Sequence, residues 1–136
     1  MKFYLAGQWS RRDEIEGYAA SLRADGHEVV SRWHSILMGD DHAVSEFNWR
    51  EWANADLDDI FKADAFVAFM EPRGTMSRGG RHVEWGFALA AMKMRDGLML
   101  IVGEEVESQF YALYTKKFRT FTELRQTYQP LPLYQP

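Results

Sequence analysis

The chain has 136 residues, of which 46% are hydrophobic and 26% charged, and it carries a formal net charge of -4. This length and composition suit one folded domain over residues 1–136 and exclude a disordered chain. The negative charge excludes a general attraction to nucleic acid or to anionic membranes, and the absence of cysteine excludes disulfides, thiolate catalysis and cysteine-ligated metals.

The N-terminal sequence and the lengths of the apolar runs indicate a cytoplasmic protein. The stretch from Met1 to Gly7 enters a strand-like pattern at once and is followed by charged residues, unlike a signal peptide. No apolar run approaches the length needed to span a bilayer. We therefore expect no membrane partner.

The first third of the chain predicts a strand, a helix and a second strand. Phe3 to Ala6 is an apolar run that Gly7 closes. Ser10 is the predicted N-cap of a helix that ends at Gly26. The helix is indicated by four side chains at helical spacing, Ile15, Tyr18, Ala19 and Leu22. The second predicted strand covers residues 28–33.

A stretch rich in tryptophan follows the second strand. Residues 34–52 lack a clean period, and we expect a long loop with some helix. Its aromatic side chains either stack on a bound ligand or belong to the core or an interface. The next segment, Asn54 to Lys62, predicts a helix that buries Leu57, Ile60 and Phe61.

The remaining elements alternate in the same way. Residues 65–70 form a continuous apolar strand of the kind buried on both faces, and residues 71–80 form the loop after it. The next helix ends near Gly97, and the strand 98–102 follows it. This helix places four apolar residues on one side, Val83, Phe87, Ala90 and Met94. Residues 118–121 predict a last strand before a helix from Thr122, and the proline-rich tail 129–136 is expected to be extended.

This alternation predicts an α/β domain with a mostly parallel five-stranded sheet and helices on both faces. Ligands bind such a sheet beyond the carboxyl ends of its strands, where the loops after the first three strands meet. The loop after the first strand, from Gly7 onward, includes Gln8, Ser10, Arg11 and Arg12 near a helix start. These residues suit an anion such as a phosphate, while solvation of the two arginines is an equally open interpretation.

The loop after the third strand leads into a glycine pair, Gly79 and Gly80, that opens the next helix. The pair lets the backbone approach a ligand closely and leaves amide donors free, although it has the spacing of neither a P-loop nor a dinucleotide fingerprint. Glu84 then falls in the first predicted turn, where the helix dipole favours its ionised form. It is either a nucleophile or a carboxylate that only complements the dipole.

No metal site is expected, because the four histidines show no ligand spacing together with carboxylates. The sequence also lacks a Ser/His/Asp elbow.

Three motifs together resemble the nucleoside 2-deoxyribosyltransferase family, which includes relatives that hydrolyse nucleoside 5'-monophosphates. They are Tyr4-Leu-Ala-Gly-Gln-Trp9, Ala55-Asp-Leu-Asp-Asp-Ile60 followed by Ala63-Asp64, and Gly79-Gly-Arg-His-Val-Glu-Trp-Gly86. The likeness covers most of residues 2–121 in order. It implies a flavodoxin-like, doubly wound domain that cleaves an N-glycosidic bond without a cofactor and passes the sugar to another base or to water.

The resemblance also implies roles for single residues. Glu84 matches the glutamate that attacks the anomeric carbon and forms a glycosyl ester. Tyr4 matches a tyrosine that orients this glutamate, and Asp56 matches an aspartate beside the base that assists proton movement. Without the resemblance, Tyr4 reads equally as a core tyrosine and Asp56 as a residue that supports a helix start.

Two departures from the family pattern concern the substrate and the assembly. The family follows its first glycine with a Pro-Phe or Trp-Phe pair, whereas this chain has Gln8-Trp-Ser-Arg-Arg12, which favours a phosphorylated substrate. The side chains expected to line the site on this basis are Gln8, Trp9, Ser10, Arg11, Arg12, Ser77, Arg78 and Arg81. A residue of a neighbouring subunit completes the family's pocket, and Ser108 or Gln109 stands at the matching place. The resemblance thus implies a homo-oligomer with a shared pocket.

A rival interpretation is a non-catalytic nucleotide-binding or sensing module of the same fold. Retention of Tyr4, Asp56 and Glu84 together argues against it. A third interpretation is binding of nucleic acid through exposed aromatic residues. The sequence argues against it, because it lacks the basic stripe that phosphate contacts require.

Overall fold

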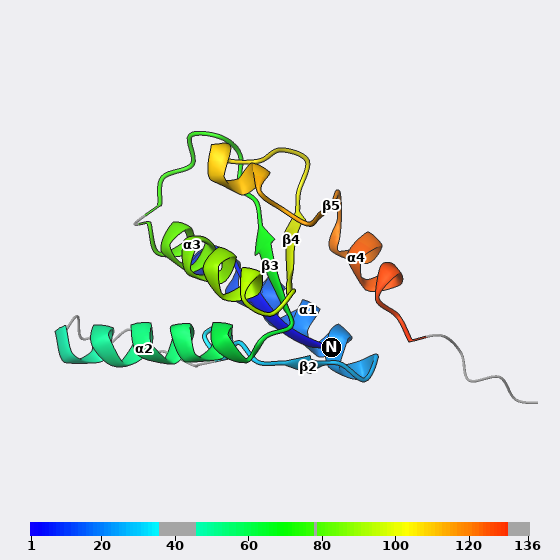
Figure 1. Cartoon of the computed structure of the whole chain (residues 1–136), viewed down its shortest axis with the longest axis horizontal. Coiled ribbons are helices and arrows are strands. Elements are labelled where there is room, and N and C mark those ends of the chain that lie inside the picture. The colour runs from blue at the N-terminus through cyan, green and yellow to red at the C-terminus, as the bar shows by residue number, and fades with distance from the viewer. Residues whose placement is uncertain (36–45, 78, 131–136) are drawn as a thin grey trace, which may run out of the picture.

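The computed structural model describes residues 1–35, 46–77 and 79–130, which form a sheet between two layers of helices (Figure 1). Over these residues the sheet has five strands, all parallel, in the order β2-β1-β3-β4-β5. The strands are β1 (Lys2–Ala6), β2 (Glu28–Val29), β3 (Ala65–Phe69), β4 (Leu98–Val102) and β5 (Lys116–Phe118). This order is that of the flavodoxin-like fold, so the predicted fold class is confirmed.

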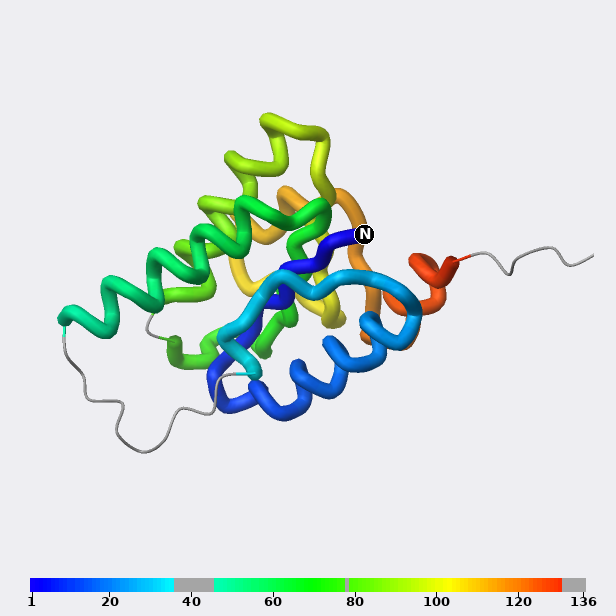
Figure 2. Tube along the Cα trace, turned by 90° about the horizontal axis from the view of Figure 1, so that it is seen from below, coloured from blue at the N-terminus to red at the C-terminus, as the bar shows by residue number. Residues whose placement is uncertain are grey.

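Two helices cover each face of the sheet in the described part of the chain. The helices are α1 (Arg12–Ala24), α2 (Glu46–Lys62), α3 (Gly80–Lys93) and α4 (Phe121–Thr127), with 3-10 turns η1 (Trp9–Arg11) and η2 (Gln109–Ala112). In Figure 1, α2 and α3 lie on one side of the strands, and α1 and α4 lie on the other. Figure 2 shows α1 across the sheet from α2 and α3. Neither these helices nor the described turns include a span long and apolar enough to cross a bilayer.

Alternation along β1 assigns its side chains to the two layers. Phe3 and Leu5 pack against α1 and α4, whereas Tyr4 and Ala6 face the layer that contains α2 and α3. All of β3 is buried, as expected of a central parallel strand. The alternation thus places Tyr4 on the same side of the sheet as α3.

The second strand is shorter than predicted, because side chains replace its ladder. After Val30, which donates its N–H to the Phe3 carbonyl, the chain leaves the sheet. The hydroxyl of Ser31 accepts the Leu5 N–H at 3.1 Å, and the indole of Trp33 donates to the Leu5 carbonyl at 2.7 Å. Both backbone groups of Leu5 are satisfied without a continued strand.

The start of α1 also differs from the prediction. Ser10 is not its N-cap, because Ser10 lies in η1 and donates its hydroxyl to the Gln8 side chain at 3.3 Å. The N-cap is Arg11, without a capping side chain. The η1 turn runs directly into α1, so the chain already has a helical conformation where α1 begins and no side-chain cap is present.

The apolar faces predicted for α2 and α3 differ from those in the structure. In α2, which extends back to Glu46, Ile60 is buried but Leu57 is only half-buried and Phe61 is exposed. In α3 the core side consists of Trp85, Ala88, Ala91 and Met92. Of the predicted apolar side, Val83, Ala90 and Met94 are exposed and only Phe87 packs against the core. The last strand ends at Phe118 and α4 begins at Phe121. Most of the predicted loop after the second strand, 36–45, and most of the tail, 131–136, lie outside the described residues.

The strand order changes direction between β1 and β3, since β1 lies between β2 and β3. Loops after these two strands therefore diverge at the carboxyl edge and leave a crevice there. Gly7 ends β1 at this point, where a Cβ would collide with the Ile15 side chain.

Candidate functional site

A cleft of about 1110 Å³ opens at this crevice. Its walls come from the loops after β1, β2 and β3, from α2 and from the start of α3. Predicted site residues that line it are Gly7, Gln8, Trp9, Ser10, Asp56, Ser77, Gly80, Arg81 and Glu84. The sequence motifs therefore converge on one cleft.

Tyr4 does not line the cleft itself but contacts Glu84, which does. Tyr4 is fully buried in β1, where its ring stacks on Phe66 with 5.2 Å between centroids. Its phenol donates to Glu84 Oε2 at 3.2 Å, across the boundary between the sheet and α3. Burial and the nearby carboxylates raise the pKa of Tyr4, so the phenol stays protonated and remains a donor.

The predicted ionisation of Glu84 is wrong. Glu84 lies one turn further into α3 than expected, beyond the reach of the strongest part of the helix dipole. Burial, with a second contribution from the negative charge of Asp56, raises the pKa of Glu84 to about 8. The bond from Tyr4 and the charge of Arg81 lower it, but less.

Asp56 completes a pair of carboxyl groups. It lies on α2 and lines the cleft, and burial followed by the charge of Asp59 raises its pKa to about 6. Because Glu84 and Asp56 interact, the two groups titrate as a pair. Near pH 7 the free pocket holds about one proton on this pair.

The start of α3 presents backbone donors to the cleft. Gly79 is the N-cap and has a φ of 90°, which favours glycine. Its own N–H donates to the Ser77 hydroxyl at 3.0 Å, and its carbonyl accepts from the N–H groups of His82 and Val83. Gly80 and Arg81 come before His82 in the chain, so their N–H groups lie in the first turn of the helix, where no helical carbonyl is available to accept them.

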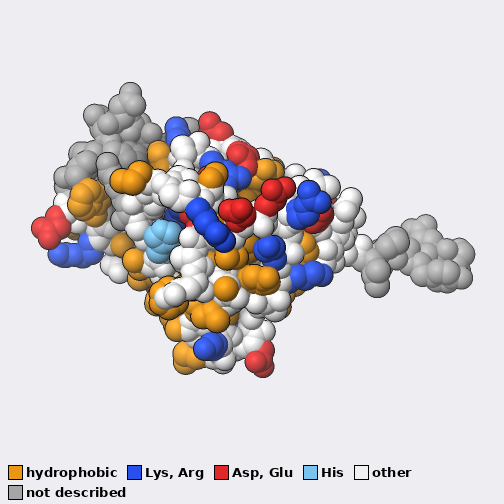
Figure 3. Space-filling view, turned by 90° about the horizontal axis from the view of Figure 1, so that it is seen from above, with side chains coloured by type: hydrophobic (Ala, Val, Ile, Leu, Met, Phe, Trp, Pro, Cys, Tyr) orange, Lys and Arg blue, Asp and Glu red, His pale blue; other side chains and the backbone are white. Residues whose placement is uncertain are grey.

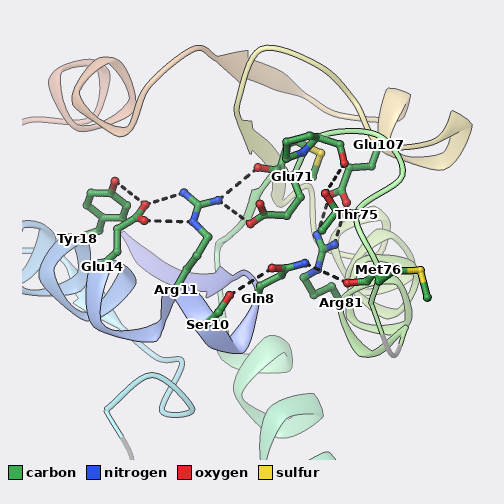
Figure 4. Close-up of polar contacts among 12 residues, drawn as sticks. Gln8, Ser10, Arg11, Glu14, Tyr18, Glu71, Thr75, Met76, Arg81 and Glu107 are labelled. Atoms are coloured by element: carbon green, nitrogen blue, oxygen red, sulfur yellow. Dashed lines mark hydrogen bonds and ion pairs between the residues drawn. The ribbon is translucent and has the colours of Figure 1, made fainter.

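Arg81 is held firmly beside these amides. Its two terminal nitrogens donate to Glu107 at 2.7 and 2.8 Å, and the side chains of this pair are only 10% and 8% exposed (Figure 4). Its Nε is buried without a hydrogen-bond partner among the described residues. A buried donor at the edge of a cleft calls for an acceptor from a ligand or from water.

The other predicted arginines do not line the cleft. Arg11 donates to Glu14 and Glu71 and to the Met70 carbonyl, so it ties the first loop to the third (Figure 4). Arg12 lies over the Trp9 ring, with 4.9 Å from its guanidinium carbon to the ring centroid. Carboxylates thus occupy the guanidinium of Arg11, and an aromatic ring lies against that of Arg12. Arg78 lies outside the described residues.

Gln8 and Ser10 join the two loops at the cleft entrance. The Gln8 amide donates to the Met76 carbonyl at 3.4 Å and accepts from Ser10 (Figure 4). Both side chains therefore line the cleft with polar atoms next to the start of α3.

Ser108 and Gln109 do not line the cleft of their own chain. Both are exposed at η2, which is tied to α3 by a bond from the Trp85 indole to the Phe110 carbonyl at 2.9 Å. A second tie joins His82 Nδ1 and the Tyr111 hydroxyl at 2.8 Å. The side chains of Ser108 and Gln109 are therefore accessible to a neighbouring molecule.

The tryptophans form much of the cleft wall. The four that line it are Trp9, Trp33, Trp49 and Trp52. The rings of Trp9 and Trp33 lie 6.3 Å apart. Trp33 also packs against the core, whereas the position of Trp49 and Trp52 in the wall favours the ligand-stacking alternative for this aromatic stretch.

The sequence reasoning missed two charged residues of the cleft, Arg32 and Asp59. Arg32 Nε donates to both Asp59 oxygens at 3.1 and 3.0 Å, and its Nη2 lies 3.0 Å from Asp59 Oδ1. Two signals could have found them. Asp59 is one turn after Asp56 on a helix, and Arg32 follows a strand at the ligand-binding edge. Among the described residues no group of three or more metal-ligating side chains occurs.

Solved structures with this fold were found at low sequence identity. A 2-deoxyribosyltransferase from Bacillus psychrosaccharolyticus matches with a TM-score of 0.67 and 19% identity, over 91% of this chain and 90% of that one. A CMP N-glycosidase from Clostridium botulinum matches with a TM-score of 0.56 and 20% identity, over 93% of this chain and 97% of that one. A conserved protein from Enterococcus faecalis matches with a TM-score of 0.64 and 16% identity, over 93% and 95%.

A scan against protein-family models and a search of curated proteins each found no match. The structural matches include the family that the sequence motifs resemble, and they confirm the fold that it implies.

Proposed function

We propose that this chain is an enzyme of the nucleoside 2-deoxyribosyltransferase type, which cleaves the N-glycosidic bond of a 2'-deoxynucleoside or its 5'-monophosphate. The observation that carries the proposal is the bond from the Tyr4 phenol to Glu84, in a cleft that Asp56 also lines. The similarity in fold to a deoxyribosyltransferase and to a CMP N-glycosidase supports it.

In the first step Glu84 attacks C1' of the sugar. A new bond forms between a Glu84 oxygen and C1', while the bond from C1' to the base nitrogen breaks and its electron pair goes to the base. Asp56 gives the base a proton, which makes the nitrogen a better leaving group. The two carboxyl groups share one proton near pH 7, which rests mainly on Glu84 because its pKa is the higher. The reacting form is the one in which this proton has moved to Asp56, so that Glu84 is the nucleophile and Asp56 the acid.

In the second step water or another base attacks C1' from the vacated side. The bond to Glu84 breaks, the carboxylate returns, and Asp56 takes a proton from the attacking group. Two displacements at C1' retain its configuration. Tyr4 holds one Glu84 oxygen throughout, so that the other is aimed at the sugar. These steps require no cofactor.

A 5'-phosphate has a matching site at the start of α3. Gln8, Ser10, Gly80 and Arg81 all line the cleft there. The amides of Gly80 and Arg81 lie in the first turn of the helix, and Arg81 Nε has no partner among the described residues. We therefore favour a nucleoside 5'-monophosphate as substrate.

The assembly we propose is a homo-oligomer in which Ser108 or Gln109 reaches the pocket of a neighbouring subunit. Both side chains are exposed at η2 beside apolar residues that are also exposed, among them Phe110 and Leu113. An exposed apolar patch of this kind suits a protein interface.

Release of free base separates this proposal from a nucleotide-binding module without chemistry. Wild-type protein and the variant E84Q are incubated with deoxynucleosides and their monophosphates, and free bases are measured by chromatography. We expect base release by the wild type alone, faster from monophosphates. Release from no substrate would favour the binding module, and equal rates with and without phosphate would count against the phosphate site.

A further inference from the structure

Arg32 lies at the cleft wall and is oriented by a buried partner. Its side chain is 59% exposed, whereas that of Asp59 is 2% exposed, so the pair bridges the interior of α2 and the open cleft. Asp59 engages the Nε side of the guanidinium through both of its oxygens. This contact fixes the plane of the guanidinium and leaves its outer edge to the cleft.

The backbone around Arg32 is also fixed. Its carbonyl accepts from both the N–H and the hydroxyl of Ser35, at 3.1 and 2.9 Å. Before it, the buried hydroxyl of Ser31 accepts the Leu5 N–H and lies 2.7 Å from His34 Nε2. Arg32 is therefore a prepositioned group at the cleft rather than a mobile surface arginine.

A buried chain of hydrogen bonds anchors this segment to α1. His34 Nδ1 lies 2.5 Å from Glu16 Oε2. The ionised Glu16 carboxylate only accepts, so His34 donates its Nδ1–H to Glu16, and Nε2 of the neutral ring accepts from the Ser31 hydroxyl. Burial lowers the pKa of His34, which agrees with this neutral form.

The outer edge of the Arg32 guanidinium offers donors only. Of its five N–H groups, those on Nη1 have no partner among the described residues, and Nη2 contacts one carboxylate oxygen. Two adjacent donors bind two adjacent acceptors, as arginine does with O6 and N7 of guanine. The edge therefore suits a ligand that presents a pair of neighbouring acceptors.

The position of Arg32 assigns this edge to the base of the substrate. Asp59 is one helical turn from Asp56, and Trp33 and Trp52 line the same cleft. The proposed phosphate site lies across the cleft, at the start of α3. Resting on the proposed function, we infer that Arg32 selects the leaving base by binding two adjacent acceptors, which cytosine presents as O2 and N3 and guanine as O6 and N7.

The other two common bases lack this pair. Adenine places an amino group beside N1 and N7, and thymine separates its two carbonyl oxygens by an N–H group. A fixed donor pair meets at most one acceptor on either of them, so both bind more weakly.

Binding is measured by calorimetry in an E84Q background, so that the substrate is not consumed. The ligands are the four 2'-deoxynucleoside 5'-monophosphates. We expect the cytosine or the guanine nucleotide to bind about tenfold or more tightly than those of thymine and adenine, and R32M to remove this difference. A preference that persists in R32M, or is absent from the parent, would overturn the inference.

Two further variants exclude indirect effects. In R32M/D59N the buried carboxylate is neutralised, and selectivity should stay lost; its recovery would show that Arg32 acts only on Asp59. The control R125M removes a comparable arginine, paired with Asp25 away from the cleft, and should keep the preference. Base release by the wild type without base preference would overturn this inference alone, whereas no release and no binding would overturn the proposed function as well.

Discussion

At the scale of single residues, the pKa of Glu84 governs the chemistry that we propose. The helix dipole stabilises a nearby carboxylate by about 0.3–1 kcal/mol. Burial and the charge of Asp56 act in the opposite direction and raise the pKa from 4.5 to about 8, which corresponds to several kcal/mol at about 1.4 kcal/mol per unit. Burial therefore decides the ionisation state, and the free pocket retains a proton that the leaving base requires.

The pH dependence of base release tests this shared proton. Below the Asp56 pKa of about 6 the pair gains a second proton and loses its nucleophile, and above the Glu84 pKa of about 8 it loses its acid. We expect a bell-shaped profile of kcat/KM between these values. In Y4F the bond that lowers the Glu84 pKa is absent, so the alkaline limb should move to higher pH and kcat/KM should fall about tenfold or more. An alkaline limb that moves to lower pH would contradict this account.

The same burial makes Glu84 costly for stability at high pH. Its pKa is raised on folding, so its contribution to stability is greatest below the unfolded value and is lost as pH rises through about 8. E84Q cannot ionise and should exceed the wild type in free energy of unfolding by several kcal/mol at pH 9, with little difference at pH 4. Urea denaturation at both pH values measures this. A gain that does not grow with pH would argue against a buried, ionisable Glu84.

The residues that meet in the cleft were predictable, but their environments were not. The motifs identified Tyr4, Asp56 and Glu84 because residue type and order carry that information. Arg11 pairs with Glu71 and Arg81 pairs with Glu107, and both of these partners come from distant parts of the chain. Arg32 and Asp59 escaped prediction for the same reason, since 27 positions separate the two.

At the scale of elements, the glycine N-cap of α3 sets the position of both Arg81 and Glu84. Gly79 has a φ of 90°, so G79A should lower the free energy of unfolding by about 1 kcal/mol and also reduce base release by displacing the start of α3. G17A is the matched control, because Gly17 is exposed in α1 with open space around its Cα, and it should stabilise by about 0.5–1 kcal/mol. Thermal unfolding measures the stability of G79A and G17A, and the base-release assay measures their activity. Equal effects of the two variants would contradict the assigned role of Gly79.

Element prediction was accurate where apolar pattern decides structure, as in β1, β3 and β4. It was inaccurate where side chains take over backbone hydrogen bonds. Ser31 and Trp33 end β2 early by satisfying Leu5, and this long-range substitution leaves no periodic signal in the sequence. The apolar residues Val83 and Met94 likewise belong to a visible pattern, but periodicity alone does not tell which side of α3 faces the sheet.

At the scale of the whole molecule, exposed apolar side chains offer a surface for the homo-oligomer that we propose. Val83 and Met94 on α3 are 67% and 85% exposed, and Phe110 at η2 is 60% exposed. Figure 3 shows hydrophobic side chains gathered over the lower half of one face, with charged side chains around them. A second copy of the chain is the partner that our proposed shared pocket requires.

A shared pocket predicts complementation between inactive variants. E84Q lacks the nucleophile, and S108A/Q109A lacks the residues that would reach a neighbour. In an equimolar mixture refolded together, half of the dimers pair one of each, and one of their two pockets is intact, so about a quarter of wild-type activity should return. Sedimentation equilibrium confirms the assembly. A monomer, or no recovery despite subunit exchange, would contradict the shared pocket.

The central claim is a transient bond between Glu84 and C1' of a sugar. A 2'-fluoro-substituted deoxynucleoside 5'-monophosphate slows the second step more than it prevents the first, so the glycosyl ester should accumulate. Mass spectrometry of the digested protein should then find the sugar phosphate on Glu84 in the wild type and none in E84Q. Attachment to another residue, or base release without any adduct, would contradict the mechanism.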